Sequence, residues 1–453
     1  MMIFHKVLEI YSKYYICIPC LGRMFSLLGT STTNKKRGYS LLLSLTMENH
    51  RKYLSNDDDQ QAEALKYLKI LAENAHFLPA QKVLENEGLK YSEKHPYQAC
   101  YLCHDIFSNF DNYINEVKVK LKGIEFNDFL VGSSPDSQII NNEDKFKTEF
   151  KLLLAEAFKS HFNRMIGKKL MVMLKKTPEF NNPDILIIYS LRFDSFKIDI
   201  IIKSLFIYGR YNKLIRGIPQ THWFCRNCLG KGCEQCNFTG KQYLTSIEEL
   251  ISPEFVNESE ATDSKFHGAG REDIDVRMLG TGRPFILELR NPKVRNLNLV
   301  YIEKIVNKSL KKKVKVSNLK YSNKREVIKL KAESKNTKKT YKAVIQVQNR
   351  ITKEFFEEKL RKLKTIFENQ KIHQRTPIRV SHRRVDKVRK KIIYKITGKY
   401  IKSNLFEFTI ETQGGTYIKE LINGDQGRTS PSFSEVFEFP LVCKELDVFN
   451  ISL

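Results

Sequence analysis

The 453-residue sequence contains no uninterrupted apolar run close to the roughly 18 residues that a membrane-spanning helix requires. It contains one tryptophan, no evident internal repeat and no low-complexity block longer than the acidic run at residues 57–59. Because 41% of its residues are hydrophobic and 11% are aromatic, a wholly disordered chain is excluded. The length predicts about two to three folded domains.

Two motifs of common hydrolases are also missing. The sequence has no Gly-x-x-x-x-Gly-Lys-Ser/Thr loop for nucleotide phosphates and no His-Glu-x-x-His helix for a catalytic zinc ion. Their absence argues against an NTPase and against a zinc peptidase.

Acidic residues are scarce in one quarter of the chain. Residues 291–400 contain 34 Lys and Arg against 8 Asp and Glu, which accounts for the whole net charge of +26. The other residues carry 43 charges of each sign. A solvated surface normally intersperses both signs, so this basic segment favours a polyanionic partner, with nucleic acid first and an anionic membrane second.

Eight of the nine cysteines form four Cys-x-x-Cys pairs, and only Cys443 stands alone. A long, Lys-rich chain without a convincing secretory signal does not suit a disulfide framework. We therefore expect a reducing compartment, nucleus or cytoplasm. The basic first 46 residues make a mitochondrial transit peptide the weaker alternative, because its removal would delete Cys17 and Cys20.

Two cysteine groups could each hold a metal ion. Cys225, Cys228, Cys233 and Cys236 have the form of a zinc knuckle, but four residues between the pairs is a short spacing, and a redox pair or unbound thiols remain alternatives. Cys17 and Cys20 could close one four-thiolate site with Cys100 and Cys103, and chance occurrence of two leftover pairs is the competing explanation.

The first 205 residues predict an α+β accessory domain. Helical stripes cover 61–77 and 142–165, the second with Leu153 among its inward residues. Two short β-branched runs follow at 185–189 and 198–202 and predict paired strands.

A second, larger α+β domain is predicted over 246–453, with residues 206–245 as a cysteine-rich joint. Alternating patterns predict strands at 327–331, 341–347 and 405–410. Residues 351–368 predict a helix with apolar side chains in a stripe along one face and basic side chains on the opposite face.

The densest candidate for chemistry is the segment 266–284, in which three carboxylates and three guanidinium groups lie among glycines. Arg271 next to Glu272 and Asp273 would keep a carboxylate ionised, which is the state in which it acts as a nucleophile. A surface loop with internal ion pairs is the plainer alternative. His267 alone is more typical of a structural residue than of a base.

Gly270-Arg271-Glu272-Asp273 resembles the Gly-Arg-Thr-Asp segment of tRNA pseudouridine synthases. The longer run 266–285 is similar to the archaeal and eukaryotic family with a THUMP-containing accessory domain, the tenth pseudouridine synthase family. That family modifies uridines 54 and 55 in the T arm of tRNA. Segments 204–211, 374–384 and 414–420 agree in the same order, and the resemblance is dense over 184–436.

This resemblance implies roles for five residues. Asp273 occupies the nucleophile position, Tyr341 that of the tyrosine that stacks on the target base, and Tyr417 that of an aromatic residue bordering the substrate. Lys419 stands where relatives place a basic residue that pairs with the catalytic carboxylate, and Arg271 would support it. Ordinary strand packing is the alternative for both tyrosines.

The resemblance also implies a structural zinc ion bound by Cys17, Cys20, Cys100 and Cys103, and it leaves metal binding at Cys225–Cys236 undecided. No cofactor is expected for catalysis. The expected partner is the T arm of tRNA, with no membrane and a monomeric protein.

Two other functions compete with this reading. A catalytically silent RNA-binding protein of the same fold, acting in small-RNA processing, is the main alternative. The joint presence of Arg271, Asp273, Tyr341 and Tyr417 argues against it. A membrane-surface protein is weaker, because the basic segment is not one amphipathic helix.

Overall fold

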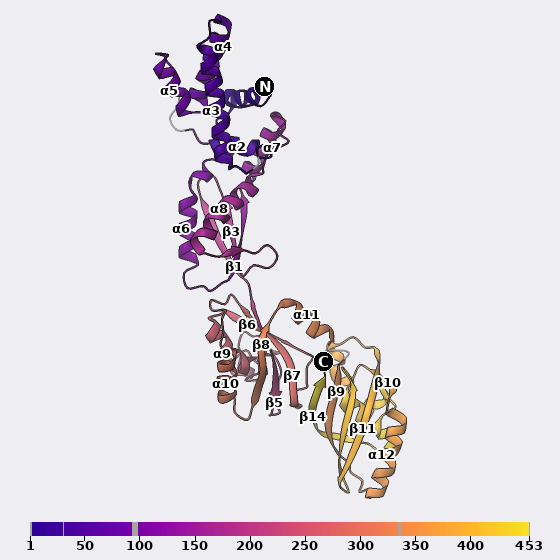
Figure 1. Ribbon diagram of the computed structural model, residues 1–453. Helices are drawn as coiled ribbons and strands as arrows, with labels where there is room; N and C mark the ends of the chain where they lie inside the picture. The colour runs from indigo at the N-terminus through magenta and orange to yellow at the C-terminus, as the bar shows by residue number, and fades with distance from the viewer. Residues whose placement is uncertain (1, 30, 93–97, 334–336, 453) are drawn as a thin grey trace. The chain divides into compact units, whose positions relative to one another are not determined.

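The computed structural model describes residues 2–29, 31–92, 98–333 and 337–452, so residues 334–336 of the basic segment lie outside the described part. The chain divides into two compact units, Met1–Lys203 and Ser204–Leu453 (Figure 1). Residues 206–245, which the sequence suggests as a joint, therefore belong to the second unit. Within the described ranges, no helix is both long and apolar enough to cross a bilayer.

The first unit combines a helical part with a small mixed sheet. The sheet has the order β2-β1-β3-β4, with β1 parallel to β2 and β3, and β3 antiparallel to β4. Its strands are β1 (Asp128–Pro135), β2 (Thr177–Pro178), β3 (Ile185–Leu191) and β4 (Phe196–Ile202). Alternate residues of β3 are buried, as the β-branched run predicts.

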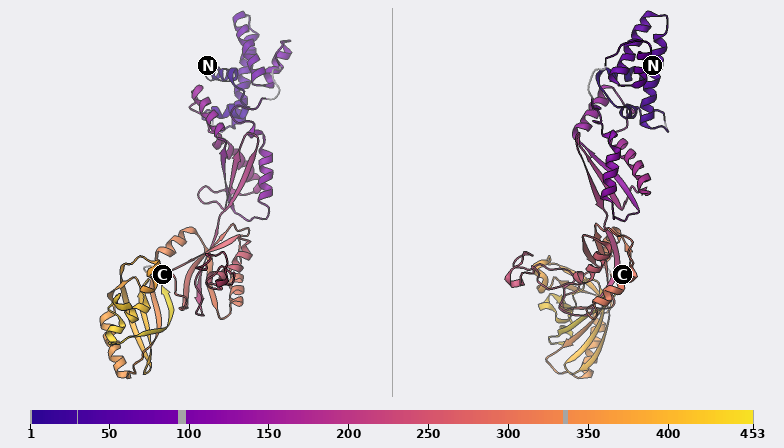
Figure 2. Two further views of the ribbon diagram at one scale, coloured as in Figure 1. Left: turned by 180° about the vertical axis from the view of Figure 1, so that it is seen from behind. Right: turned by 90° about the vertical axis from the view of Figure 1, so that its left-hand side faces the viewer.

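Helices precede and flank this sheet (Figures 1 and 2). They are α1 (Met2–Lys13), α2 (Ile18–Met24), α3 (Asn34–Tyr53), α4 (Asp58–Lys69), the π-helical η1 (Ile70–Asn74), α5 (Leu78–Asn86), η2 (Ile106–Ser108), α6 (Phe110–Lys120), α7 (Ser137–Glu149) and α8 (Phe158–Leu174). One core of buried side chains runs through the helices and the sheet.

The single helix predicted over 142–165 is wrong, because α7 ends at Glu149 and α8 begins at Phe158. Glu143 explains the break: its carboxylate accepts a hydrogen bond from the backbone N–H of Phe158 at 2.8 Å and pairs with the buried Arg23 at 2.6 Å. The chain must turn back to make these contacts. Leu153, predicted to face inward, is 91% exposed in the connection.

The second unit is built on a ten-stranded sheet that is antiparallel except where β14 runs parallel to β7. The strand order is β13-β10-β11-β12-β9-β14-β7-β5-β8, with β6 paired to β7. The strands are β5 (Leu205–Lys213), β6 (Asp263–Gly268), β7 (Arg277–Arg290), β8 (Val314–Ser322), β9 (Lys338–Gln346), β10 (Gln370–Arg375), β11 (Val388–Lys402), β12 (Leu405–Gln413), β13 (Thr429–Ser430) and β14 (Val442–Ser452).

Helices cover this sheet and complete its core (Figure 1). They are η3 (Glu234–Cys236), α9 (Ile247–Ser259), α10 (Leu299–Ser309), α11 (Lys324–Glu333), α12 (Lys353–Phe367), η4 (Ile378–Arg383), α13 (Ile418–Asn423), η5 (Asp425–Gly427) and α14 (Phe433–Phe437). Thr352 caps α12 by accepting a hydrogen bond from Phe355, and the apolar stripe of α12 packs on the sheet as predicted. The α+β fold class predicted from the sequence is confirmed.

The strand predicted over 327–331 is wrong, because these residues lie in α11. The side chain of Asn323 accepts a hydrogen bond from the backbone N–H of Glu326 at 3.0 Å, which caps the helix start. Val327 and Leu330 are buried three residues apart, which is a helical spacing, whereas Ile328 is 64% exposed.

Candidate active site

The loop between β6 and β7 carries the candidate nucleophile. It is fixed at its start by the backbone bonds Ala269 N–H to Pro284 O and Gly270 N–H to Gly268 O. Gly270 has a φ of +82°, and a Cβ there would lie 3.1 Å from Nη1 of Arg283 and 3.3 Å from Nζ of Lys339. The positive φ therefore favours glycine at this position, and the close approach of the Arg283 and Lys339 side chains leaves little room for a Cβ.

Glu272 anchors this loop to the core through its side chain, which is completely buried. Its carboxylate pairs with Nε of Arg283 at 2.7 Å and accepts hydrogen bonds from the Tyr211 hydroxyl at 2.8 and 2.9 Å. Gln220 extends the network by donating to the Tyr211 oxygen and to the carbonyl of Gly270. A buried ion pair of this kind is costly to break on one side only.

Lys213, at the end of β5, supports the same loop by binding the backbone of the loop with its side chain. Its buried ammonium group donates to the carbonyl oxygens of Ile218, Ile274 and Asp273, at 2.7, 2.8 and 3.3 Å. Burial lowers the pKa of Lys213 to about 8. The sequence does not single out Lys213, since a lysine at the end of a strand carries no distinguishing pattern.

Asp273 faces the cavity rather than the core, and its side chain is 32% exposed. Its Oδ2 pairs with Nη1 of Arg379 at 2.9 Å. Burial opposes the charge of Arg379, but the hydrogen bond and charge of Glu420, together with Asp273, raise the pKa of Arg379 well above its usual range. The guanidinium group of Arg379 therefore stays charged beside the Asp273 carboxylate.

Lys419 does not pair with Asp273, contrary to what the resemblance implies. Its Nζ lies 2.6 Å from Oδ2 of Asp275, and Arg379 takes the place beside Asp273. Arg271 does not take that place either: its guanidinium group lies over the ring of Trp223, 5.8 Å from the ring centroid. Two carboxylates two residues apart thus have different cationic partners.

Both predicted tyrosines line the same cavity. Tyr341 lies on β9 between β12 and β14, and burial raises its pKa to about 12. Tyr417 precedes α13, and the side chain of the buried Gln374 holds its backbone N–H and C=O, each at 2.9 Å. The Tyr417 hydroxyl accepts a hydrogen bond from Arg384 at 3.3 Å.

The cavity has a volume of about 1180 Å³, which exceeds the roughly 300–1,000 Å³ of ordinary small-molecule pockets. Ten Lys and Arg residues line it against three carboxylates, and seven of the ten come from the basic segment. They are Arg271, Arg283, Lys339, Arg379, Arg384, Lys387, Arg389, Lys390, Lys391 and Lys419. The five residues singled out from the sequence, Arg271, Asp273, Tyr341, Tyr417 and Lys419, all line this one basic cavity.

Lys339 is the most deeply buried lysine of the cavity, with 5% of its surface exposed. Burial, with a further contribution from the neighbouring Arg283, lowers its pKa to about 7. It lies two residues before Tyr341 on β9, so both side chains point to one face of the sheet. The alternating pattern of the strand indicates this placement but not the low pKa.

Both four-cysteine groups have the geometry of a metal site. Within each group the four sulfur atoms all lie within 4.8 Å of one another. The distances are 3.6 Å for Cys17–Cys103 and 3.7–3.9 Å among Cys225, Cys228, Cys233 and Cys236. Tetrahedral Zn–S bonds of about 2.3 Å would place the sulfurs about 3.8 Å apart, whereas a disulfide would require about 2.05 Å. The residues present therefore fit a structural metal ion in both places.

Two family models match parts of this chain. The family model "Pus10, C-terminal" matches residues 206–452, and "Pus10 THUMP domain, archaeal" matches residues 113–190. The tRNA pseudouridine synthase Pus10 of Methanocaldococcus jannaschii is 40% identical over 98% of this chain and 93% of its own length. The chain belongs to the Pus10 family.

Other Pus10 proteins are similar over more than nine tenths of their length. Those of Methanothrix thermoacetophila and Methanopyrus kandleri are each 36% identical, and the matches cover 96% and 98% of this chain and 91% and 97% of theirs. Both are named tRNA pseudouridine synthases. Among solved structures, a Cbf5-Nop10-Gar1 complex matches 45% of each chain at 15% identity with a TM-score of 0.27, which is too weak to support an argument.

Proposed function

We propose that this protein isomerises uridine 55, and uridine 54 as well, in the T arm of tRNA to pseudouridine, with Asp273 as the nucleophile. The observation that carries the proposal is the partly exposed ion pair of Asp273 and Arg379 inside a cavity lined by ten Lys and Arg residues. An ionised carboxylate at a site that attracts phosphates can act on a nucleotide of an RNA chain.

In this reaction the N1–C1′ bond breaks, the uracil ring turns, and a C5–C1′ bond forms. The hydrogen at C5 leaves and N1 carries one in the product, so no oxidant, reductant or nucleoside triphosphate is consumed. Asp273 supplies the carboxylate that attacks or assists at the sugar or base. Tyr341 offers an aromatic face to a base removed from its stack, which offsets part of the few kcal/mol that unstacking costs.

The cations position the substrate rather than select its sequence. Seven of the ten that line the cavity lie between residues 339 and 391, so the excess charge of the basic segment is concentrated where the reacting nucleotide would enter. Phosphate contacts of this kind fix the register of an RNA chain and make binding salt-dependent.

Product mapping tests this proposal. Purified protein incubated with an unmodified tRNA transcript, without any nucleotide cofactor, should form pseudouridine at position 55 and at position 54 of the T arm. A transcript with cytidine at both positions is the control. Binding of the transcript without any pseudouridine would instead support the catalytically silent RNA-binding protein.

We further propose that both cysteine groups bind structural zinc. Their all-sulfur donor sets leave no position for a reactive water, so the metal would stabilise folding and take no part in the chemistry. Purified protein should contain two zinc ions per chain, and Cys103→Ser should remove one and destabilise the first unit. A content of two that survives Cys103→Ser would contradict this assignment.

A further inference from the structure

Arg379 does not reach Asp273 unaided, because it lies on the short η4 in the connection between β10 and β11. Glu420 of α13 holds it from the opposite side: Nε of Arg379 lies 2.6 Å and Nη2 lies 3.5 Å from the two Glu420 carboxylate oxygens. Glu420 is 3% exposed, so water does not compete for this contact. Arg379 therefore bridges a buried carboxylate and the carboxylate of Asp273.

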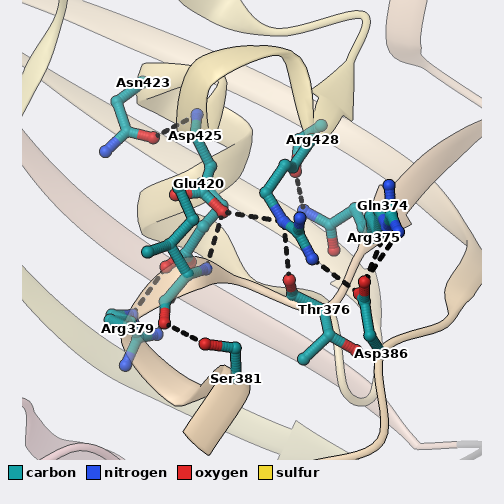
Figure 3. Close-up of polar contacts among 12 residues, drawn as sticks. Gln374, Arg375, Thr376, Arg379, Ser381, Asp386, Glu420, Asn423, Asp425 and Arg428 are labelled. Carbon is teal, nitrogen blue, oxygen red and sulfur yellow. Dashed lines mark hydrogen bonds and ion pairs between the residues drawn. The ribbon is translucent and has the colours of Figure 1, made fainter.

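Residues that follow Glu420 in the sequence also contact the connection between β10 and β11, as Figure 3 shows. The carboxylate of Asp425 accepts a hydrogen bond from the backbone N–H of Ile378 at 3.1 Å. Arg428 donates to the carbonyl of Thr376 at 2.9 Å and pairs with Asp386 at 2.6 Å, while Arg375 pairs with the other Asp386 oxygen at 2.8 Å. Both ends of the segment that carries Arg379 are thus tied down.

We propose that Glu420 is a positioning residue for the reaction, acting on Asp273 only through Arg379. Two of the guanidinium nitrogens face Glu420, which leaves Nη1 directed at Asp273 with a defined geometry. Without Glu420, Arg379 keeps its charge but loses the contact that fixes its rotamer. This inference rests on the proposed function, since it concerns the orientation of the proposed nucleophile.

A double-mutant cycle tests this role in the full-length protein. Glu420→Gln should slow single-turnover pseudouridine formation at saturating enzyme by about 10- to 100-fold, because small displacements of reacting groups have effects of that size. Affinity for the tRNA transcript should stay within about threefold, and Glu420→Asp should recover part of the rate. In the background of Arg379→Ala, which itself slows the reaction, Glu420→Gln should add almost nothing.

Glu143→Gln is the matched control, because Glu143 is equally buried and pairs with Arg23 at the same 2.6 Å, but in the first unit. It should lower stability without changing the saturated rate. Full, multiplicative effects of Glu420→Gln and Arg379→Ala would overturn the inference, as would an unchanged rate in Glu420→Gln. Inactive wild-type protein would instead contradict the proposed function itself.

A separate observation concerns the cysteine-rich knuckle, residues 224–241. It presents three large apolar side chains to solvent: Phe224, Leu229 and Phe238 are 64%, 77% and 74% exposed. Leu229 and Phe238 also have positive φ angles, which bulky side chains rarely adopt. The right-hand view of Figure 2 shows this segment projecting from the second unit.

The knuckle is continuous with the cavity, because Trp223, the residue before Phe224 in the sequence, lines the cavity. Exposed Arg226 and Lys231 lie among the apolar side chains of the knuckle. Exposed aromatic rings can stack on unstacked bases, and cations between the rings can contact the phosphate backbone. We infer that the knuckle binds unstacked bases of the RNA loop whose nucleotide enters the cavity, an inference that also rests on the proposed function.

The test compares loop RNA with paired RNA. Phe238→Ala should weaken binding of a T-arm hairpin by about 5- to 100-fold, whereas Phe238→Tyr should bind like the wild type. Affinity for a fully paired RNA of the same length should not change, because its bases are already stacked. Phe180→Ala, an equally exposed phenylalanine of the first unit, is the control. Equal losses for both RNAs, or no loss with a normal zinc content, would overturn the inference.

Discussion

Glu272 and Asp273 are adjacent carboxylates with arginine partners, yet their surroundings differ completely. The buried pair, Glu272–Arg283, lies under the loop with both side chains at most 2% exposed. The open pair, Asp273–Arg379, faces the cavity with both side chains about one third exposed. Burial, the ion pair with Arg283 and the hydrogen bonds from Tyr211 commit Glu272 to holding the loop. Partial exposure leaves Asp273 available to a substrate.

Breaking the buried pair should give the largest effect on stability. Glu272→Gln leaves Arg283 with an uncompensated buried charge, which typically costs about 3–5 kcal/mol. Trp223, the single tryptophan, lies in the second unit, so its fluorescence during urea unfolding reports the stability of that unit. Asp273→Asn, measured in the same way, should change the free energy of unfolding by less than about 1 kcal/mol. Equal losses in both variants would remove the distinction between the two pairs.

The sequence predicts part of this arrangement from local patterns. The alternation over 341–347 places Tyr341 on β9 correctly. The spacing of the cysteines indicates two candidate four-sulfur sites, and the sulfur atoms of each lie together in the structure. For the segment 266–284 the sequence leaves two interpretations open, catalytic chemistry or a loop with internal ion pairs. The structure has features of each, since Glu272 forms an internal ion pair with Arg283 while Asp273 faces the cavity.

The rest depends on contacts that no local spacing encodes. Arg379 and Glu420 are 41 residues apart, and they meet only because β10, β11 and β12 bring η4 beside α13. Lys419 could have paired with either Asp273 or Asp275, which are two residues apart, and the loop conformation selects Asp275. The residues of α11 match a strand pattern because its two buried residues, Val327 and Leu330, fall within a run that also alternates in part.

The effect of replacing Lys339 on the free energy of unfolding should depend on pH. Its pKa is about 7 in the folded protein and near 10.5 when unfolded, so between these values the unfolded chain binds more protons and wild-type stability rises with pH. Lys339→Met should therefore be more stable than the wild type at about pH 6, by about 1–3 kcal/mol, and should lose much of this advantage by about pH 9.

The control for that measurement is Lys342→Met. Lys342 lies on the same strand, but its side chain is partly exposed and pairs with Glu407. Urea unfolding at the two pH values gives both differences. A stability difference between Lys339→Met and the wild type that does not vary with pH would mean that Lys339 is charged in the folded protein throughout.

The smallest effect is expected at the rim of the cavity. Tyr417→Phe removes only a hydroxyl that accepts a long, exposed hydrogen bond from Arg384, so pseudouridine formation should fall by no more than about threefold. Tyr417→Ala removes the ring from the cavity lining and, if the ring borders the substrate as proposed, should slow the reaction much more. Equal rates for the two variants, measured under single-turnover conditions, would contradict a role for the ring.

The most direct test replaces the exposed carboxylate alone. Asp273→Asn preserves the shape of the side chain and removes its charge, so it should reduce pseudouridine formation on a tRNA transcript by more than about 10³-fold. Affinity for the transcript should remain within a few-fold, because ten cations of the cavity are unchanged. An Asp273→Asn protein that forms pseudouridine at the wild-type rate would contradict the assignment of Asp273 as the nucleophile.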